Sequence, residues 1–509
     1  MAEHVQRRMR MYGNITNPRK EGVLGLSALA SIIGVVVAIL VFVTMPLGIW
    51  VQSFVVIVGA ATMIGISWDG RNGRKKFEEV LGRRHFKKAE DKGFTNYAAG
   101  PTSQLPGGDF PPVGILARTE LVGTTPAGSR TEKAMIWNPS NRTGTVIFSV
   151  QSPGMGLLDQ ESIDLMVDQW GIFQREAGVS SSLVQVAATT QATRDPGNRL
   201  PDAVRVTREQ SQVADIPAFA REAMDEIVAD LNQGVPKIDQ WVAATFTARP
   251  NREAGTEPRS REDLAEDIST LLPGMLAQLK VACGGTVSVL GMDDVVDQVH
   301  TAYNPAVAPA VETARLAGEG TGLTWGEVGP TNAKLTPGWW EHAGYFSKSW
   351  QMYQPPAANF RETGLAGLLS AHGVFEQKRV TLLFRPMSPG GSQKAVQDQV
   401  MNAQFGNSQK GKKPSQIKKV ALEKAEYSER EQAEGAAMVR FGLVVTATVD
   451  DPTKFARVEA ILRDQAVSGI QLRLRDCEYS DDAAFAFGLG IGSVPKDFTR
   501  LSNTLRESV

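Results

Sequence analysis

Hydrophobic residues are gathered most densely near the start of the chain, in two stretches without any charged side chain. They cover residues 23–44 and 47–67, and only Met45 and Pro46 lie between them. Each is about twenty residues long, the length at which an α-helix crosses roughly 30 Å of hydrocarbon. The pattern therefore predicts a transmembrane hairpin of two helices. The predicted limits of the two helices are Val23, Thr44, Leu47 and Ser67.

Basic residues lie on the outer flanks of the hairpin and are missing from its turn. Cytoplasmic flanks carry the excess of Lys and Arg, so both termini are expected in the cytoplasm. The sequence thus predicts a two-span protein of the cytoplasmic (inner) membrane, in contact with membrane lipid. The residues expected to set this topology are Arg19, Lys20, Arg71, Arg74, Lys75 and Lys76.

After the hairpin, short apolar stretches typical of strands alternate with longer stretches of helical periodicity. Strands and helices without a strict βαβ repeat favour an α+β fold with two ferredoxin-like lobes in the cytoplasm. We expect the lobes at residues 113–303 and 339–495, joined by a loop at 304–338 that is rich in Gly and Pro. The remaining segments are a basic lead at 1–22, a basic collar with a Gly/Pro linker at 68–112, and a tail at 496–509.

Two elements of the second lobe are predicted from local composition. Residues 392–434 form a long, charged helical stretch that a Gly- and Lys-rich segment interrupts at 406–415. The apolar residues 483–489 read as a final strand.

Charge is distributed unevenly along the chain of 509 residues, although its net charge is only −1. Residues 1–92 hold fourteen Lys/Arg and seven Asp/Glu, a net charge of +7, so the rest of the chain carries −8. A mildly acidic soluble region is unsuited to coating nucleic acid, and no direct nucleic-acid partner is expected. The two cysteines, Cys283 and Cys477, have no metal-ligand spacing and fit a reducing compartment.

No motif in the sequence carries a complete catalytic or cofactor site. Residues 406–413 approach the phosphate loop G-x-x-x-x-G-K-[ST], but Lys413 stands where the Mg²⁺-binding hydroxyl belongs. Gly488, Gly490 and Gly492 follow an apolar stretch without a dinucleotide-binding βαβ unit after them. The five histidines are scattered, so no metal is predicted. We therefore expect a protein without cofactors that is not an enzyme.

Two segments are candidates for binding a protein partner. The aromatic residues of 339–353 belong to side-chain types enriched at contact surfaces, although a strand packed into the second lobe is the stronger explanation for them. A helix as polar as 392–434 has little to bury in its own domain and so is free to meet a charged partner. The candidate residues are Trp339, Trp340, Trp350, Tyr353, Glu423, Glu426, Glu429, Glu431 and Glu434.

The order of these parts resembles a known family. The basic lead, hairpin, collar and linker precede the segment GMGLLD at 154–159, an aromatic strand ending in Pro355-Pro356, the segment FRP at 384–386 and the strand GLVVTAT at 442–448. This arrangement is similar to actinobacterial conjugation-associated membrane proteins. In these a PrgI-like hairpin is fused to a region resembling the N-terminal, non-ATPase half of the type IV secretion ATPase.

The resemblance implies a non-enzymatic membrane scaffold in a type IV secretion or conjugation apparatus. Its implied partners are a separate secretion ATPase, other membrane subunits and further copies of itself. Two alternatives stay open at this point. One is an EccE-like subunit of a type VII secretion system, and the other is a membrane-anchored enzyme such as a glycosyltransferase, which would need a sugar-nucleotide or metal site.

Overall fold

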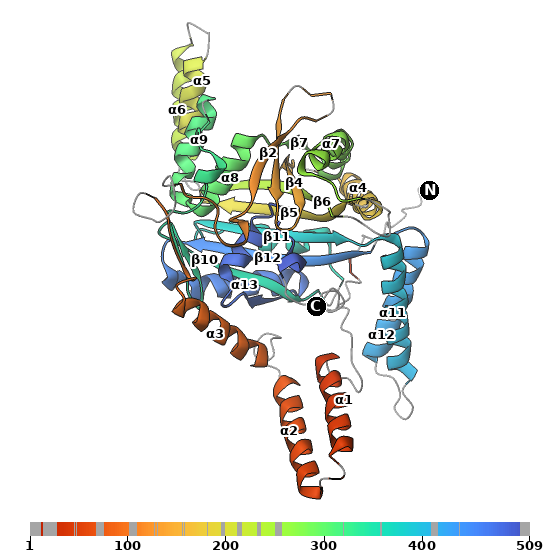
Figure 1. Cartoon of the computed structure of the whole chain (residues 1–509). Helices are drawn as coiled ribbons and strands as arrows, with labels where there is room; N and C mark the ends of the chain where they lie inside the picture. The colour runs from red at the N-terminus through yellow and green to blue at the C-terminus, as the bar shows by residue number, and fades with distance from the viewer. Residues whose placement is uncertain are drawn as a thin grey trace, which may run out of the picture.

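A computed structural model describes most of the chain. The described residues are 12–13, 28–44, 46, 48–67, 76–100, 109–126, 128–129, 131–154, 156, 158–180, 182–194, 199–210, 216–231, 236–249, 257–318, 320–356, 359–408, 416–436 and 438–498. Their strands form a single 13-stranded sheet in which all pairings are antiparallel (Figure 1). The path through the sheet is β1-β8-β9-β10-β12-β11-β5-β6-β4-β3-β2, with β13 added on β10 and β7 on β4.

The centre of the sheet consists of two units with the same chain order, β-α-β-β-α-β. The first unit contains β4 (Thr143–Gln151), α4 (Gln160–Val179), β5 (Leu183–Thr193), β6 (Lys237–Thr247), α7 (Arg261–Cys283) and β7 (Thr286–Val289). The second contains β10 (Tyr345–Gln354), α10 (Ala366–Leu369), β11 (Gln377–Pro386), β12 (Val439–Val449), α13 (Phe455–Ile470) and β13 (Arg473–Asp476). The strands lie in the order β7-β4-β6-β5 in one unit and β13-β10-β12-β11 in the other, so equivalent strands take equivalent places.

The two units join through their equivalent strands β5 and β11. These strands pair antiparallel from Thr193–Gln377 to Val186–Phe384, which makes one continuous sheet of the two halves. Backbone hydrogen bonds thus run without a break across the junction, and each strand covers an edge of the other that would otherwise be open. The remaining strands extend the sheet at its ends: β1 (Asn96–Ala98), β2 (Glu120–Thr124), β3 (Lys133–Asn138), β8 (Asn332–Leu335) and β9 (Trp340–His342).

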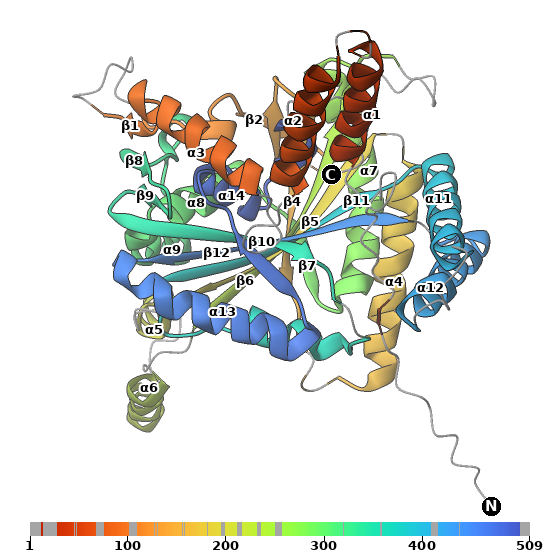
Figure 2. The ribbon, with the colours of Figure 1, turned by 90° about the horizontal axis from the view of Figure 1, so that it is seen from below.

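Both faces of the sheet carry an apolar core. On one face α4 and α7 cover the first unit around Phe148, Phe246 and Leu264, while α13 and α10 cover the second around Val445. Figure 2 shows α13 and α4 on their two halves of the sheet. The opposite face packs against α8 (Met292–Tyr303) and α14 (Asp481–Gly488), with Tyr303 and Phe485 stacked at a ring distance of 5.4 Å.

The remaining helices lie outside this body. They are α1 (Ala28–Val43), α2 (Ile49–Ser67), α3 (Lys76–Asp91), α5 (Arg199–Gln210), α6 (Ala218–Leu231), α9 (Ala308–Ala317), α11 (Pro389–Ser408) and α12 (Gln416–Ala433). Short 3-10 turns occur at Gly114–Leu116, Pro305–Val307, Trp325–Glu327, Glu362–Leu365, Pro452–Lys454 and Pro495–Phe498.

The helices near the N-terminus contradict the predicted transmembrane hairpin. The described part of α1 has 16 residues, roughly 24 Å at about 1.5 Å per residue, against roughly 30 Å of hydrocarbon. In the part of the chain that the structure describes, no helix combines the length and the apolar character that crossing a membrane requires. The predicted two-span topology and inner-membrane location are therefore wrong by this finding. Of the predicted limits and flanking charges, Thr44, Ser67 and Lys76 are described, and Val23, Leu47, Arg19, Lys20, Arg71, Arg74 and Lys75 lie outside the described residues.

The predicted fold of two separate ferredoxin-like lobes is also wrong, because one 13-stranded sheet runs through both regions. The expected inter-lobe loop at 304–338 contains α9 and the sheet strand β8. The expected linker contributes β1, which pairs with β8. The expected strand at 483–489 is the helix α14, because its Ala-rich sequence favours a helix.

Candidate interaction arms

Two helical hairpins project from the sheet, and both are inserted at the same place in the repeated unit. The first arm, α5–α6, connects β5 to β6, and the second arm, α11–α12, connects β11 to β12 (Figure 1). Each insertion thus joins the second strand of its unit to the third. Because β5 and β11 run antiparallel at the junction, the two arms leave the body in opposite directions.

The first arm is a hairpin of amphipathic helices. Pro201 lies in the first turn of α5, where its missing N–H costs no helical hydrogen bond. Pro217 stands just before α6 and accepts hydrogen bonds from the amides of Ala220 and Arg221. Across the hairpin, Arg208 and Asp225 form an ion pair of 2.8 Å. Both partners are largely exposed, so this pair contributes little to stability.

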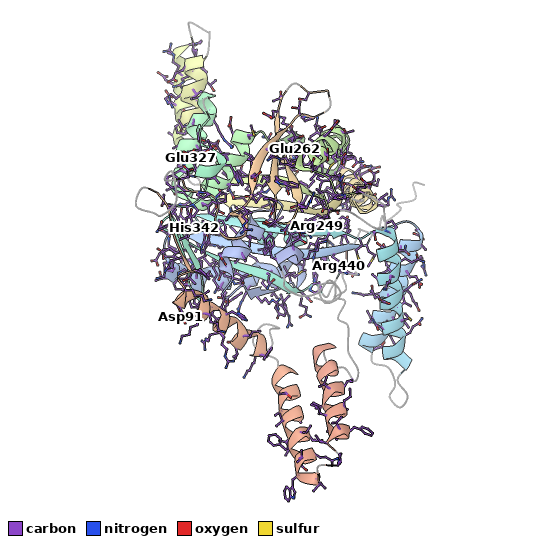
Figure 3. All side chains as sticks on the ribbon, in the orientation of Figure 1. Asp91, Arg249, Glu262, Glu327, His342 and Arg440 are labelled. Atoms are coloured by element: carbon purple, nitrogen blue, oxygen red, sulfur yellow. The ribbon has the colours of Figure 1, made fainter. Side chains whose placement is uncertain are left out.

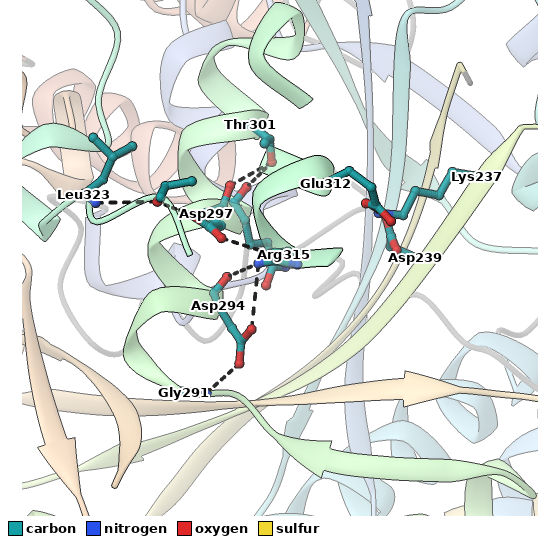
Figure 4. Close-up of polar contacts among 11 residues, drawn as sticks. Lys237, Asp239, Gly291, Asp294, Asp297, Thr301, Glu312, Arg315 and Leu323 are labelled. Atoms are coloured by element: carbon teal, nitrogen blue, oxygen red, sulfur yellow. Dashed lines mark hydrogen bonds and ion pairs between the residues drawn. The ribbon is translucent and has the colours of Figure 1, made fainter. Parts of the chain in front are cut away.

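A third helix, α9, packs on α5 and is held in place by ion pairs (Figure 4). Arg315 of α9 donates from Nε to Asp297 of α8 at 2.9 Å and from Nη2 to the carbonyl oxygen of Asp294 at 3.2 Å. The Asp297 side chain is only 2 % exposed, and its second oxygen accepts a 2.5 Å hydrogen bond from Thr321. Because both oxygens of this buried carboxylate are paired, it holds Arg315, and with it α9, in one position.

Helix α9 also contacts the start of β6, the strand that follows the first arm. Lys237, the first residue of β6, reaches Glu312 of α9 at 2.6 Å and Asp239 at 3.6 Å. The first arm is therefore braced at its base by α9, which contacts the sheet and α8 through charged groups.

The second arm relies on contacts within its own hairpin. Its small core consists of Val396 and Val400 from α11 and Ala425 from α12. At the base, the amide of Met387 donates to the carbonyl of Met438 at 3.0 Å, which closes the hairpin. The charged helical stretch predicted at 392–434, with its expected interruption at 406–415, corresponds to two antiparallel helices, and Lys410, Lys412 and Lys413 lie outside the described residues.

The five predicted glutamates occupy the exposed side of the second arm. Glu423, Glu426, Glu429 and Glu431 lie on α12, and Glu434 directly follows it; all five are exposed. Gly435 ends the segment with a φ of +97°, and the amide of Ala436 returns to Glu431, a Schellman-type stop. These residues stay candidates for a partner surface.

The predicted aromatic surface is part of the core instead. Trp340 and Trp350 are 3 % and 1 % exposed. Trp339 stacks on Phe455 at 6.2 Å, and Tyr353 is half-buried. The interpretation of these residues as a partner-binding edge is therefore wrong for Trp340 and Trp350, because they alternate inward from strands that are covered on the relevant face.

Buried polar residues also lie on the face of the sheet that packs against α8 and α14, which we call the central face. The ring of His342 lies between the carbonyl oxygen of Tyr303, 2.5 Å from Nδ1, and the hydroxyl of Ser347, 2.7 Å from Nε2. Burial lowers the pKa of His342 to about 3, so the ring is neutral. The guanidinium of Arg379 lies 4.4 Å from the Phe485 ring, and burial lowers its pKa to about 9.

Close packing explains why glycine occupies positions 488, 490 and 492. This segment crosses the central face, and a Cβ on Gly488, Gly490 or Gly492 would meet threonine hydroxyls at 2.5, 2.2 or 1.9 Å. The threonines Thr446, Thr189 and Thr145 come from β12, β5 and β4, so the segment spans both units. Its carbonyls accept hydrogen bonds from Thr381, Trp241 and Gln185. We call residues 488–494 the strap.

Residues 406–413, which approach the phosphate-loop pattern, do not begin in the structural context of a phosphate loop. Gly406 lies inside α11, whereas the first glycine of such a loop follows a buried strand. Within the described ranges, no group of three or more His, Cys, Asp or Glu side chains is arranged to hold a metal ion.

Comparison with known proteins gives no family for the chain. No protein-family model matches the sequence, and no curated protein matches it.

Sequence reasoning missed the first arm as a candidate surface. Residues 199–210 contain a proline and many charges, which hid the helix α5. A detectable signal was the spacing of acidic residues at 222, 226 and 230, which places three like charges on one ridge of α6.

Proposed function

We propose that this chain is a non-enzymatic scaffold subunit of a type IV secretion or conjugation apparatus and that it docks a separate ATPase. The observation that carries the proposal is the pair of helical arms at equivalent positions of the two units. Each arm presents exposed charged and apolar side chains well away from the sheet, a form suited to holding a partner at a distance from a rigid body.

Exposed apolar side chains on α1 and α2 support an assembly role. Phe42, Trp50 and Phe54 are 76 %, 87 % and 68 % exposed, and many neighbouring Val and Ile side chains are exposed as well. Figure 3 shows side chains standing out from both helices. A contiguous apolar surface of this kind marks a site that another component covers.

The ATPase is assigned to the second arm. α12 places its glutamates on the exposed side and adds the half-exposed Tyr427 and Val420 beside them. A charged surface with an aromatic anchor favours fast, specific docking of a partner with the opposite charge.

The proposal is tested by purifying the chain from its native cells in mild detergent and asking whether a secretion ATPase co-elutes. A variant with Glu423, Glu426, Glu429, Glu431 and Glu434 all changed to Lys should lose the ATPase and DNA transfer, because like charges then face each other. The control reverses Glu222, Glu226 and Asp230 of the first arm, which leaves ATPase binding intact. Retention of the ATPase by the five-fold variant at normal salt would refute the docking role of α12.

A further inference from the structure

The outer face of α6 is apolar although nothing in the described chain covers it. Phe219, Met224 and Ile227 are 80 %, 40 % and 47 % exposed. At about 100° per residue these three side chains fall within one face of the helix. The α6 residues that face α5 are on the other side, where Asp225 pairs with Arg208.

An acidic ridge borders this apolar face. Glu222, Glu226 and Asp230 follow one another at intervals of four residues, so they form a single row along α6. All three are exposed. A partner that covers Phe219 and Ile227 therefore needs an apolar surface edged by positive charge.

Helix α3 of the same sequence has these properties. Its inner side carries Phe86, which is buried against Tyr479 at a ring distance of 5.5 Å. Its outer side carries Phe77, Val80 and Leu81, which are 49 %, 52 % and 43 % exposed. Three exposed basic residues continue this outer side toward the C-terminal end of the helix: Arg84, Lys87 and Lys88.

The two helices lie far apart within one chain. Both views place α3 beside the α1–α2 hairpin, whereas α6 is at the tip of the first arm on a distant side of the sheet (Figures 1 and 2). We propose that α6 of one copy binds α3 of a second copy, with Phe219, Met224 and Ile227 packed on Phe77, Val80 and Leu81. The acidic ridge then faces Arg84, Lys87 and Lys88.

This contact uses two different surfaces of the same chain, so it is heterologous. Each copy keeps a free α3 at one end and a free α6 at the other, and further copies add until a ring closes or a filament grows. The contact also explains why the first arm is braced by α9. An arm that holds a neighbouring copy transmits force to its base, and the ion pairs of Arg315 and Lys237 fix that base.

The experiment uses two complementary charge reversals in the full-length chain, purified in mild detergent. One variant carries Glu222→Lys, Glu226→Lys and Asp230→Lys, and the other carries Arg84→Glu, Lys87→Glu and Lys88→Glu. Mass is measured by light scattering after size-exclusion chromatography at low ionic strength. Each variant alone should associate at least about a hundredfold more weakly than the natural chain, since like charges then meet at the contact. An equimolar mixture of the two should regain the natural mass, because opposite charges meet again at every contact.

The matched control reverses three glutamates of the second arm, Glu423, Glu426 and Glu429, and should keep the natural mass. It separates this inference from the proposed function, because that control lowers ATPase binding whereas the α6 reversal lowers self-association. The inference is overturned if the natural chain is a monomer, if either reversal keeps the natural mass, or if the mixture of the two variants does not recover it.

Discussion

The two arms are inserted at the same position of the same unit, yet they are stabilised differently. The first is held from outside by α9 and by the ion pairs of Asp297 and Lys237. The second is held by its own small core of Val396, Val400 and Ala425, and no comparable third helix lies against it in the described part of the chain. The comparison indicates that the repeat fixes where an arm leaves the sheet, while segments outside the repeat decide how firmly it is held.

The largest effect is expected where the strap couples both units. Gly492→Ala would place a Cβ 1.9 Å from the hydroxyl of Thr145 on a backbone with a φ of +105°. We expect a loss of more than about 4 kcal/mol, or failure to fold, because both overpacking and backbone strain act there. Chemical denaturation measures the loss, and hydrogen exchange should show both units losing protection together.

Gly318→Ala is the matched control for that substitution. Gly318 also has a left-handed backbone, with a φ of +77°, but no atom lies within 4 Å of its virtual Cβ. Its replacement should cost only about 1–2 kcal/mol from the backbone alone. Equal losses for the two variants would show that contact with the threonines does not constrain the strap.

A smaller loss of stability is expected in the first arm but not in the second. Asp297→Ala leaves Arg315 and Thr321 without their carboxylate partner and so releases α9. Because Arg315 is 39 % exposed, the expected loss is only about 1–3 kcal/mol. Hydrogen exchange should rise in α5 and α6 and stay unchanged in α11 and α12. Arg208→Ala, which removes only an exposed pair, should leave both arms unchanged.

A pH-dependent effect is expected from a buried carboxyl on the central face. Burial raises the pKa of Asp481 to about 8, and this carboxyl accepts a 2.9 Å hydrogen bond from the amide of Ser349. The unfolded chain ionises this group near pH 4, so folding is penalised as pH rises from about 4 to about 8. Thermal unfolding between pH 6.5 and about 8 should show the natural chain losing stability and Asp481→Asn losing less. Parallel curves for the two proteins would contradict a neutral, buried Asp481.

Local pattern predicted several elements of the fold. The packed strand considered for residues 339–353 corresponds to β9 and β10, and the interruption expected at 406–415 separates α11 from α12. The pairing of β5 with β11 could not be predicted, because partner choice between distant strands depends on tertiary packing rather than on either strand's own sequence. This pairing is what turns two expected lobes into one sheet.

The candidate partner surfaces could also be predicted only in part from the sequence. Exposed glutamates of the second arm follow from a helix too polar to bury, and the structure leaves them exposed. The aromatic residues near Trp340 could not be placed from sequence, since a large side chain suits both a contact surface and a core. Only the position of the strand within the sheet distinguishes the two, and it places Trp340 and Trp350 inside.

The strap also determines when the protein can complete its folding during synthesis. Residues 488–494 are synthesised after both units, yet they cover threonines of β4, β5 and β12. During synthesis the first unit therefore has its central face open while the second is still emerging. A chain released before residue 488 therefore lacks the segment that contacts both halves, and it exposes apolar surface that quality-control proteases recognise.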